Sequence, residues 1–275
     1  MKPKNIWIWT ISAIVYLGLV IGGYSVYANV NSANNHTDDR TTQEADNDDH
    51  GTQGSEHSDH GTPLKSEVAT NVAYEDGVIT IDLKDENQNP PELEISHEKI
   101  MHLIIVSADL KDYFHLHPKD KGNGVYTEKF NLPENSYKVF VDIKPKSLAY
   151  QVSPFELQVE ESHGEHKEPS LKADTTLTKT INDKAVELTT TELKVNNDVT
   201  LSFDTKGNTL DPYLGALGHV VILDEKGEKF VHVHPASEEQ TVFETKFDQP
   251  GIYKLWGEFK FDGKVNSYPF VIEVK

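Results

Sequence analysis

The sequence contains no cysteine and only two methionines, Met1 and Met101. The lack of cysteine excludes a disulfide framework, a thiolate metal site, a redox-active cysteine pair and a lipid anchor on cysteine. Met101 precedes His102, and successive strand residues point to opposite faces, so a sulfur-rich Cu(I) site is not expected. Any transition-metal site in this chain must therefore use nitrogen and oxygen ligands.

Basic residues are scarce as well. The 275 residues include 26 Lys and Arg against 45 Asp and Glu, which gives a formal net charge of -19. Such a balance argues against a nucleic-acid partner and favours an exterior that attracts cations. The length suits two domains of ordinary size.

The N-terminal segment is the longest apolar run. Lys2 and Lys4 precede an uncharged stretch from Ile6 to Ala28, and about 20 such residues span a bilayer as a helix. We expect residues 1–28 to be a single-pass anchor in the cell membrane with the rest of the chain outside the cytoplasm. The alternative is a signal peptide cut after Ala28, which would leave a secreted protein.

Residues 29–70 are predicted to be a disordered acidic linker that contains histidine. Eight acidic residues and one base, Arg40, lie between Asp38 and Asp59, and so few apolar side chains cannot offset the entropy of ordering. Asp-His-Gly-Thr occurs twice within it. This segment either collects divalent cations loosely or is a plain solvated spacer.

Short alternating segments bounded by turn residues begin near Val72, and none has a helical period. They predict an all-β fold of two tandem antiparallel β-sandwiches, immunoglobulin-like or cupredoxin-like. We place the first at residues 71–160, a linker at 161–170 and the second at 171–275. The two halves contain matching segments, Val125-Tyr-Thr-Glu-Lys-Phe in the first and Val242-Phe-Glu-Thr-Lys-Phe in the second. This match indicates duplication of a whole domain.

The motif His-x12-His-x-His-Pro occurs once in each copy. Its members are His102, His115, His117 and Pro118 in the first, and His219, His232, His234 and Pro235 in the second. An apolar run, a polar turn and a second short run predict a β-hairpin. Antiparallel pairing would place the first histidine opposite the third, with the second on the same face.

Three neutral imidazoles on one face form a metal site suited to Zn²⁺ or copper. The sequence therefore predicts six metal ligands in two sites: His102, His115, His117, His219, His232 and His234. The simpler alternative is histidine on the wet face of a strand. Asp142 and Glu258 occupy matching places and could be a fourth ligand or accept an imidazole N–H, but we expect both to be solvated carboxylates.

Asn135-Ser-Tyr-Lys-Val and Gly251-Ile-Tyr-Lys-Leu resemble the YtkA-like group of exported bacterial domains. The His-x-His-Pro hairpins resemble those of small periplasmic copper-handling sandwiches. This resemblance implies a metal-handling role outside the cytoplasm, often with copper. Blue-copper electron transfer is not expected, because it needs a cysteine ligand.

We therefore expect a membrane-tethered protein that buffers, sequesters or transfers copper or zinc. Its expected partners are metal ions and a membrane metal transporter or another exported protein. The alternative is a cell-surface adhesion or scaffold module of Ig-like repeats without a metal function. An enzyme is not expected, since the chain has no His-Glu-x-x-His helix and no Gly-x-Ser-x-Gly elbow for a hydrolase.

Overall fold

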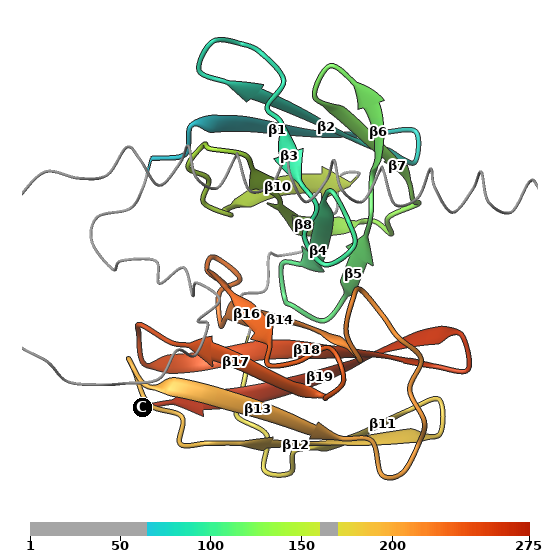
Figure 1. The fold of residues 1–275 in the computed structure, drawn as a ribbon, viewed down its shortest axis with the longest axis vertical. Coiled ribbons are helices and arrows are strands. Elements are labelled where there is room, and N and C mark those ends of the chain that lie inside the picture. Colours follow the sequence, from blue (N-terminus) through green and yellow to red (C-terminus); the bar gives the residue numbers. More distant parts are fainter. Residues whose placement is uncertain (1–64, 160–169) are drawn as a thin grey trace, which may run out of the picture. The chain divides into compact units, whose positions relative to one another are not determined.

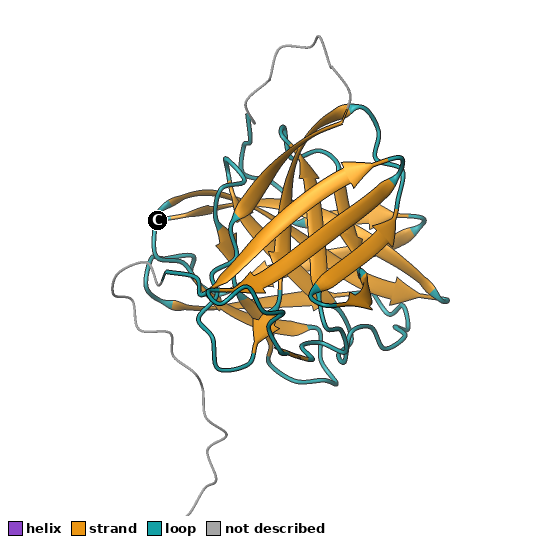
Figure 2. Ribbon diagram, turned by 90° about the horizontal axis from the view of Figure 1, so that it is seen from above, coloured by secondary structure: helices purple, strands orange, loops and turns teal. Residues whose placement is uncertain are grey.

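The computed structural model describes residues 65–159 and 170–275. The expected anchor, nearly all of the acidic linker and most of the linker at 161–170 lie outside this part. The described residues form one compact unit. Strands and loops make up all the described residues (Figure 2), and none of them forms a helix that could cross a membrane.

The first sandwich consists of two four-stranded antiparallel sheets and a short strand pair (Figure 1). The outer sheet has the order β1-β2-β7-β6, with bounds Val68–Glu75, Val78–Asp85, Val125–Lys129 and Lys119–Gly122. The second sheet has the order β10-β8-β4-β5, with bounds Pro154–Val159, Asn135–Asp142, His102–Ser107 and Tyr113–Leu116. The short pair is β3 (Leu93–Glu94) with β9 (Lys144–Pro145).

The second sandwich repeats this plan. Its outer sheet has the order β11-β12-β13-β17-β16, with bounds Thr178–Ile181, Lys184–Thr190, Asp198–Asp204, Val242–Lys246 and Val233–Pro235. Its other sheet has the order β15-β14-β18-β19, with bounds Phe230–Val231, His219–Asp224, Gly251–Phe261 and Lys264–Val274. The predicted all-β, tandem antiparallel fold is confirmed.

Each sandwich has its own apolar core and its own tyrosine hydrogen bond to a preceding carbonyl. Leu103 and Ile105 of β4 pack into the first core, and Val220 and Ile222 of β14 pack into the second. The hydroxyl of Tyr137 donates to the carbonyl of Pro133, and that of Tyr253 donates to the carbonyl of Gln249, both at 2.9 Å. This arrangement resembles the tyrosine corner of immunoglobulin-like sandwiches.

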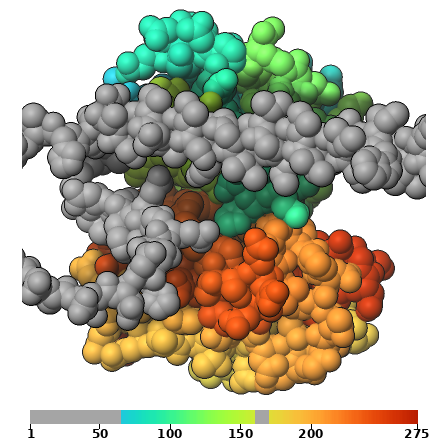
Figure 3. All heavy atoms as spheres, viewed as in Figure 1, coloured from blue at the N-terminus to red at the C-terminus, as the bar shows by residue number. Residues whose placement is uncertain are grey.

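A third apolar cluster joins the two sandwiches. Its buried members come from both copies: Ile104, Val106, Leu110, Phe140, Val221, Leu223 and Trp256. The ring of Tyr113 stacks on Trp256 with centroids 4.7 Å apart, and Lys254 Nζ donates to the carbonyl of Leu110 at 2.5 Å. Figure 3 shows green atoms of the first copy next to orange atoms of the second on the face drawn.

The central strands β4 and β14 are therefore buried on both faces. Their alternate residues serve a sandwich core on one side and the joint cluster on the other. This explains why Leu103–Val106 and Val220–Leu223 are apolar without interruption, as is typical of strands covered on both sides. The four sheets thus stack through three successive apolar layers.

Candidate metal centre between the sandwiches

The first hairpin forms as the sequence predicts. Strand β4 pairs with β5 in the register Leu103 to Leu116 and Ile104 to His115, so continuation of that register places His102 opposite His117. These three histidines share the strand face that carries Ile104 and Val106, which is the face turned toward the second sandwich. Met101 is buried in the first core, as expected.

The second hairpin departs from the prediction. Only Phe230 and Val231 pair with β14, after which the chain crosses to the other sheet, where Val233 pairs with Thr245 and His234 with Glu244. The expected pairing of His219 with His234 is therefore wrong. The second trio is divided between two sheets, so it does not form a site equivalent to the first.

A hydrogen bond particular to the second copy lies at the earlier crossover. The hydroxyl of Thr245 donates to the carbonyl of His232 at 2.7 Å, and Val233 packs against the second core. The matching residue of the first copy is Glu128, which lacks a hydroxyl, and there the chain stays in the β4 sheet through Leu116. This hydrogen bond, which the first copy lacks, accompanies the earlier crossover that separates the histidines of the second copy.

One buried cluster unites residues of both copies. His102 Nδ1 lies 2.9 Å from His115 Nε2, and His115 Nδ1 lies 2.6 Å from the Oε2 atom of Glu258. His219 Nδ1 lies 3.4 Å from the same carboxylate oxygen. The rings of His102 and His219 stack with centroids 5.4 Å apart. The second copy therefore contributes His219 and Glu258 to a centre built on the first.

Glu258 is a buried hydrogen-bond acceptor, so our expectation of a solvated carboxylate is wrong for it. Only 2% of its surface is exposed. Burial alone would raise its pKa, but the charge of His115, the hydrogen bond from His115 and the nearby ring of His219 hold the pKa of this carboxyl well below its usual range. Glu258 is thus ionised near neutral pH and fixes the orientation of His115.

One ring nitrogen of His102 and one of His115 are each hydrogen-bonded to an acceptor oxygen. Nε2 of His102 lies 3.0 Å from the carbonyl of Ser96, an oxygen that only accepts, so this nitrogen carries the proton. Nδ1 of His115 donates to ionised Glu258 for the same reason. In their neutral forms, His102 Nδ1 and His115 Nε2 then each carry a lone pair.

These two lone-pair nitrogens are the atoms that face each other at 2.9 Å. Two lone pairs at that distance repel, so a cation is needed beside them, either a proton shared between the nitrogens or a metal ion. Histidine ligands of metals commonly donate their second N–H to a carboxylate or carbonyl. The partners Glu258 and Ser96 fit that arrangement.

His117 supplies a third nitrogen. Ligand atoms of His102, His115 and His117 all lie within 4.8 Å of one another, as do those of His115, His219 and Glu258. Nε2 of His117 is buried and has no hydrogen-bond partner among the described residues. A tetrahedral site with Zn–N bonds of ~2.0–2.1 Å separates nitrogens by roughly 3.3 Å, so small side-chain movements would bring three donors to one ion.

Burial also keeps the imidazoles of His102 and His117 neutral, the form that binds metal. It lowers the pKa of His102 to about 2, helped by the charges of His115, His219 and His117 and opposed by the Ser96 carbonyl. The pKa of His117 falls to about 4, again mainly through burial. Protons therefore compete weakly at these two nitrogens near neutral pH.

Asp142 is the counterpart of Glu258 but has a different environment. It pairs with His102 across β4 and β8, as Glu258 pairs with His219 across β14 and β18. Burial raises the pKa of Asp142 to about 6, against the lowering effect of His219 and His115. The two pseudo-equivalent acids thus differ. Glu258 is ionised and hydrogen-bonded, whereas burial disfavours the ionised form of Asp142.

His97 belongs to the same neighbourhood and was missed by sequence reasoning. Its ring centroid lies 6.0 Å from that of His102 and 5.8 Å from that of His219. The matching residue in the second copy is Leu214, so the duplication gives no signal there. Only its closeness to His102 in the sequence could have drawn attention to it.

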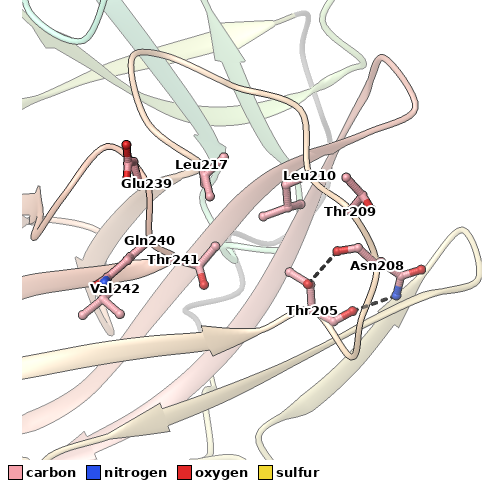
Figure 4. Close-up of a pocket in the computed structure, with 9 residues that line it drawn as sticks. All are labelled: Thr205, Asn208, Thr209, Leu210, Leu217, Glu239, Gln240, Thr241 and Val242. Atoms are coloured by element: carbon pink, nitrogen blue, oxygen red, sulfur yellow. Dashed lines mark hydrogen bonds between the residues drawn. The ribbon is translucent and has the colours of Figure 1, made fainter.

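A shallow hollow of about 490 Å³ lies elsewhere on the second sandwich (Figure 4). Its lining includes Thr205, Asn208 and Leu217, and Thr205 and Asn208 bond to each other at 2.8 and 2.7 Å. The lining contains one acid, Glu239, and no imidazole. It offers no constellation of catalytic or metal-binding groups.

Fold and site together define a pair of fused Ig-like sandwiches whose shared interface encloses imidazoles and a carboxylate. The chain belongs to the family described as Domain of unknown function (DUF8832), which matches residues 59–161 and 179–275, one segment over each sandwich. No curated protein matches the sequence. The resemblance to YtkA-like domains stays a prediction.

Solved structures show distant likeness only. The Escherichia coli adhesin FdeC has 14% identity and a TM-score of 0.24, with 76% of this chain and 64% of that chain covered. Domains FN1–FN3 of chicken CNTN1 have 11% identity and a TM-score of 0.23, with 75% and 66% covered. The Yersinia pseudotuberculosis adhesin InvE has 12% identity and a TM-score of 0.19, with 71% and 53% covered. This chain spans less than two thirds of the length of each.

Proposed function

We propose that this protein binds one transition-metal ion, Zn²⁺ or Cu²⁺, through His102, His115 and His117. Glu258 orients His115, and His219 completes the wall of the centre. In this proposal the protein buffers, sequesters or transfers the ion outside the cytoplasm, from a membrane-tethered position. A membrane metal transporter or another exported protein would receive or supply it.

The observation that carries the proposal is the pair of facing lone-pair nitrogens on His102 and His115. Their other nitrogens are committed to Ser96 and Glu258, so the space between them requires a cation. Three imidazole nitrogens favour zinc or copper over the hard cations calcium and magnesium. His102 is only 1% exposed and the side chain of His115 only 2%, which suits holding an ion better than turning over a substrate.

The test is isothermal titration of the full chain, purified without a polyhistidine tag, with Zn²⁺ and separately with Cu²⁺. The background variant carries alanine at the six histidines outside the described residues: His36, His50, His57, His60, His163 and His166. We expect one tight ion per chain, confirmed by metal analysis. His115→Ala should weaken binding by about 100-fold or more, since it removes a ligand.

His234→Ala is the matched control, because it removes an exposed imidazole and should leave the equilibrium affinity unchanged. Two tight ions per chain, or full affinity after His115→Ala, would contradict the single-centre proposal. No tight ion with either metal would refute it altogether.

A second candidate function is an adhesion or scaffold module in which the histidines only join the sandwiches. The observation in its favour is that the hydrogen bond from His115 to Glu258 links the two copies, and a proton shared between His102 and His115 would satisfy their facing nitrogens. This alternative expects a protein partner to be captured equally well with and without a chelator. It also expects chelation to leave the unfolding temperature unchanged.

A further inference from the structure

The carboxylate of Glu258 is held by one oxygen and turns the other toward two imidazoles. Its Oε1 atom accepts a hydrogen bond from the hydroxyl of Ser267 at 3.2 Å. Its Oε2 atom lies 2.6 Å from His115 Nδ1 and 3.4 Å from His219 Nδ1. His219 and Glu258 are directly opposite each other on β14 and β18, so their side chains leave the same face of the sheet. One nitrogen from each copy therefore lies beside a single carboxylate oxygen.

The nitrogen from the second copy is unsatisfied. Nδ1 of His219 is buried and makes no hydrogen bond within the described residues. Buried polar atoms are nearly always paired in native folds, and an unpaired one calls for a ligand, an ion or a water molecule. The three-imidazole site formed by His102, His115 and His117 leaves this nitrogen without a role.

The spacing of His219 Nδ1 and Glu258 Oε2 suits two ligands of one metal ion. Two ligand atoms about 2.1 Å from a metal lie roughly 3.0 Å apart at a right angle and roughly 3.4 Å apart at the tetrahedral angle. The separation in the structure is 3.4 Å. His115 supplies a third ligand, because the ligand atoms of His115, His219 and Glu258 all lie within 4.8 Å of one another. A small movement of the His115 ring away from Glu258 would admit the ion.

This second set of ligands has a different metal preference from the first. Two imidazoles and one carboxylate, with the remaining positions open, are the arrangement that holds Fe²⁺ in non-haem iron proteins, and carboxylate ligands also suit Mn²⁺. Three imidazoles without a carboxylate suit Zn²⁺ or copper. The two sets therefore sort first-row ions by their preference for oxygen.

Both sets include His115, through different nitrogens. A neutral imidazole has one N–H and one lone pair. If Nε2 binds an ion together with His102 and His117, the proton stays on Nδ1 and is donated to Glu258. If Nδ1 binds an ion together with His219 and Glu258, the proton lies on Nε2, which then donates to His102 Nδ1 at 2.9 Å. One ion on either side thus satisfies both nitrogens of the ring, whereas two ions at once would require the ring to lose its only N–H.

We propose that the centre contains a second, alternative metal position, formed by His115 Nδ1, His219 Nδ1 and Glu258, which takes Mn²⁺ or Fe²⁺. Zn²⁺ and Cu²⁺ occupy the three-imidazole position, and the protein binds one ion at a time. This inference rests on the proposed function for the role of His115 as a ligand. Exchange between the positions moves the imidazole proton from one ring nitrogen to the other through solvent and involves no electron transfer.

The test is titration of the background variant with Mn²⁺, with the free ion followed by electron paramagnetic resonance, and separately with Zn²⁺. We expect one Mn²⁺ per chain, bound more weakly than Zn²⁺ and displaced by Zn²⁺ one for one, because the positions share His115. His219→Ala should lower the ratio of Mn²⁺ to Zn²⁺ affinity by about 10-fold or more, and His117→Ala should raise it by about 10-fold or more. The ratio compares two ions in the same variant, so a general loss of stability does not imitate either result.

Asp142→Asn is the matched control, because it neutralises the pseudo-equivalent acid, which belongs to neither set of ligands. It should leave the ratio unchanged, and a shift of about 10-fold would overturn the assignment to Glu258. Tight Zn²⁺ binding without Mn²⁺ binding, or an unchanged ratio in His219→Ala, would overturn the second position and leave the proposed function standing. Simultaneous binding of Mn²⁺ and Zn²⁺ would overturn the alternation. Mn²⁺ binding without a tight site for Zn²⁺ or Cu²⁺ would refute the proposed function and leave the second position standing.

Discussion

At the scale of single residues, the centre depends on a division of roles between the copies. The first copy supplies the nitrogens of His102, His115 and His117, and the second supplies the carboxylate of Glu258. The contact between His115 and Glu258 joins residues 143 positions apart. The carboxylate of Glu258 keeps the proton of His115 on Nδ1, which leaves the lone pair of Nε2 available.

The two pseudo-equivalent acids should respond differently to neutralisation. Glu258→Gln removes the charge that accepts the N–H of His115, and we expect a loss of about 1–3 kcal/mol in the free energy of unfolding. Asp142→Asn should be neutral or stabilising at pH 7, because burial already disfavours its charge. Urea unfolding of the metal-free chains measures both, and equal losses would contradict the assigned roles.

Acidification should destabilise the metal-free protein. The pKa values of His102 and His117 fall from 6.5 to about 2 and about 4 on folding, so below pH 6.5 the unfolded chain takes up protons that the folded chain does not. Stability is then lost as pH falls, by about 1.4 kcal/mol per pH unit for each such group. Asp142, with its pKa raised to about 6, adds stability as pH falls from 6 to 3.8. This single group offsets only part of the loss from His102 and His117.

Urea unfolding at pH 7, 6 and 5 in the presence of a chelator measures this slope. His117→Gln should make the dependence shallower, because it removes one titrating group. Stability that is constant or rises on acidification would contradict the buried neutral state of these imidazoles.

Among the residues, the sequence could predict that the three histidines of the first copy lie together but not what surrounds them. The spacing of His102, His115 and His117 follows from hairpin geometry, which is local. The burial of Glu258 depends on a second sandwich that covers it, and nothing near Glu258 in the chain reveals that contact. His97 has no histidine counterpart in the second copy, so the repeat could not identify it.

At the scale of elements, β4 and β14 determine the joint face. Each is central in its sheet and is covered on both sides. The sequence predicted both strands and the register of the first hairpin. It did not predict that the chain would leave the β14 sheet after Val231 and join β17, because the contact of His232 with Thr245 joins residues 13 positions apart.

Trp256 on β18 is the largest fully buried side chain of the joint cluster. Trp256→Ala should cost about 3–5 kcal/mol of unfolding free energy and weaken metal binding, because it loosens the face that also carries Glu258. Phe243→Ala is the control, since Phe243 packs only in the second core. It should destabilise the protein by a similar amount, measured by urea unfolding, and leave metal affinity unchanged in titration. Equal effects on affinity would contradict a site that depends on the interface.

At the scale of the whole molecule, duplication has produced unequal halves. Both copies keep the three histidines and the proline, yet only the first gathers its histidines at one point. The sequence suggested two independent sites because it could not show that the two domains share a face. The structure instead gathers His102, His115, His117, His219 and Glu258 where the copies meet.

The apolar cluster shared by the two sandwiches makes each copy depend on the other during evolution. Neither half could be lost or exchanged without exposing Phe140 or Trp256 to water, and exposed apolar patches of this kind promote association. A lineage with a single copy would need polar side chains at these positions, or would need to pair with a second molecule through the same surface. The gene duplication, once its products had packed in this way, became difficult to reverse.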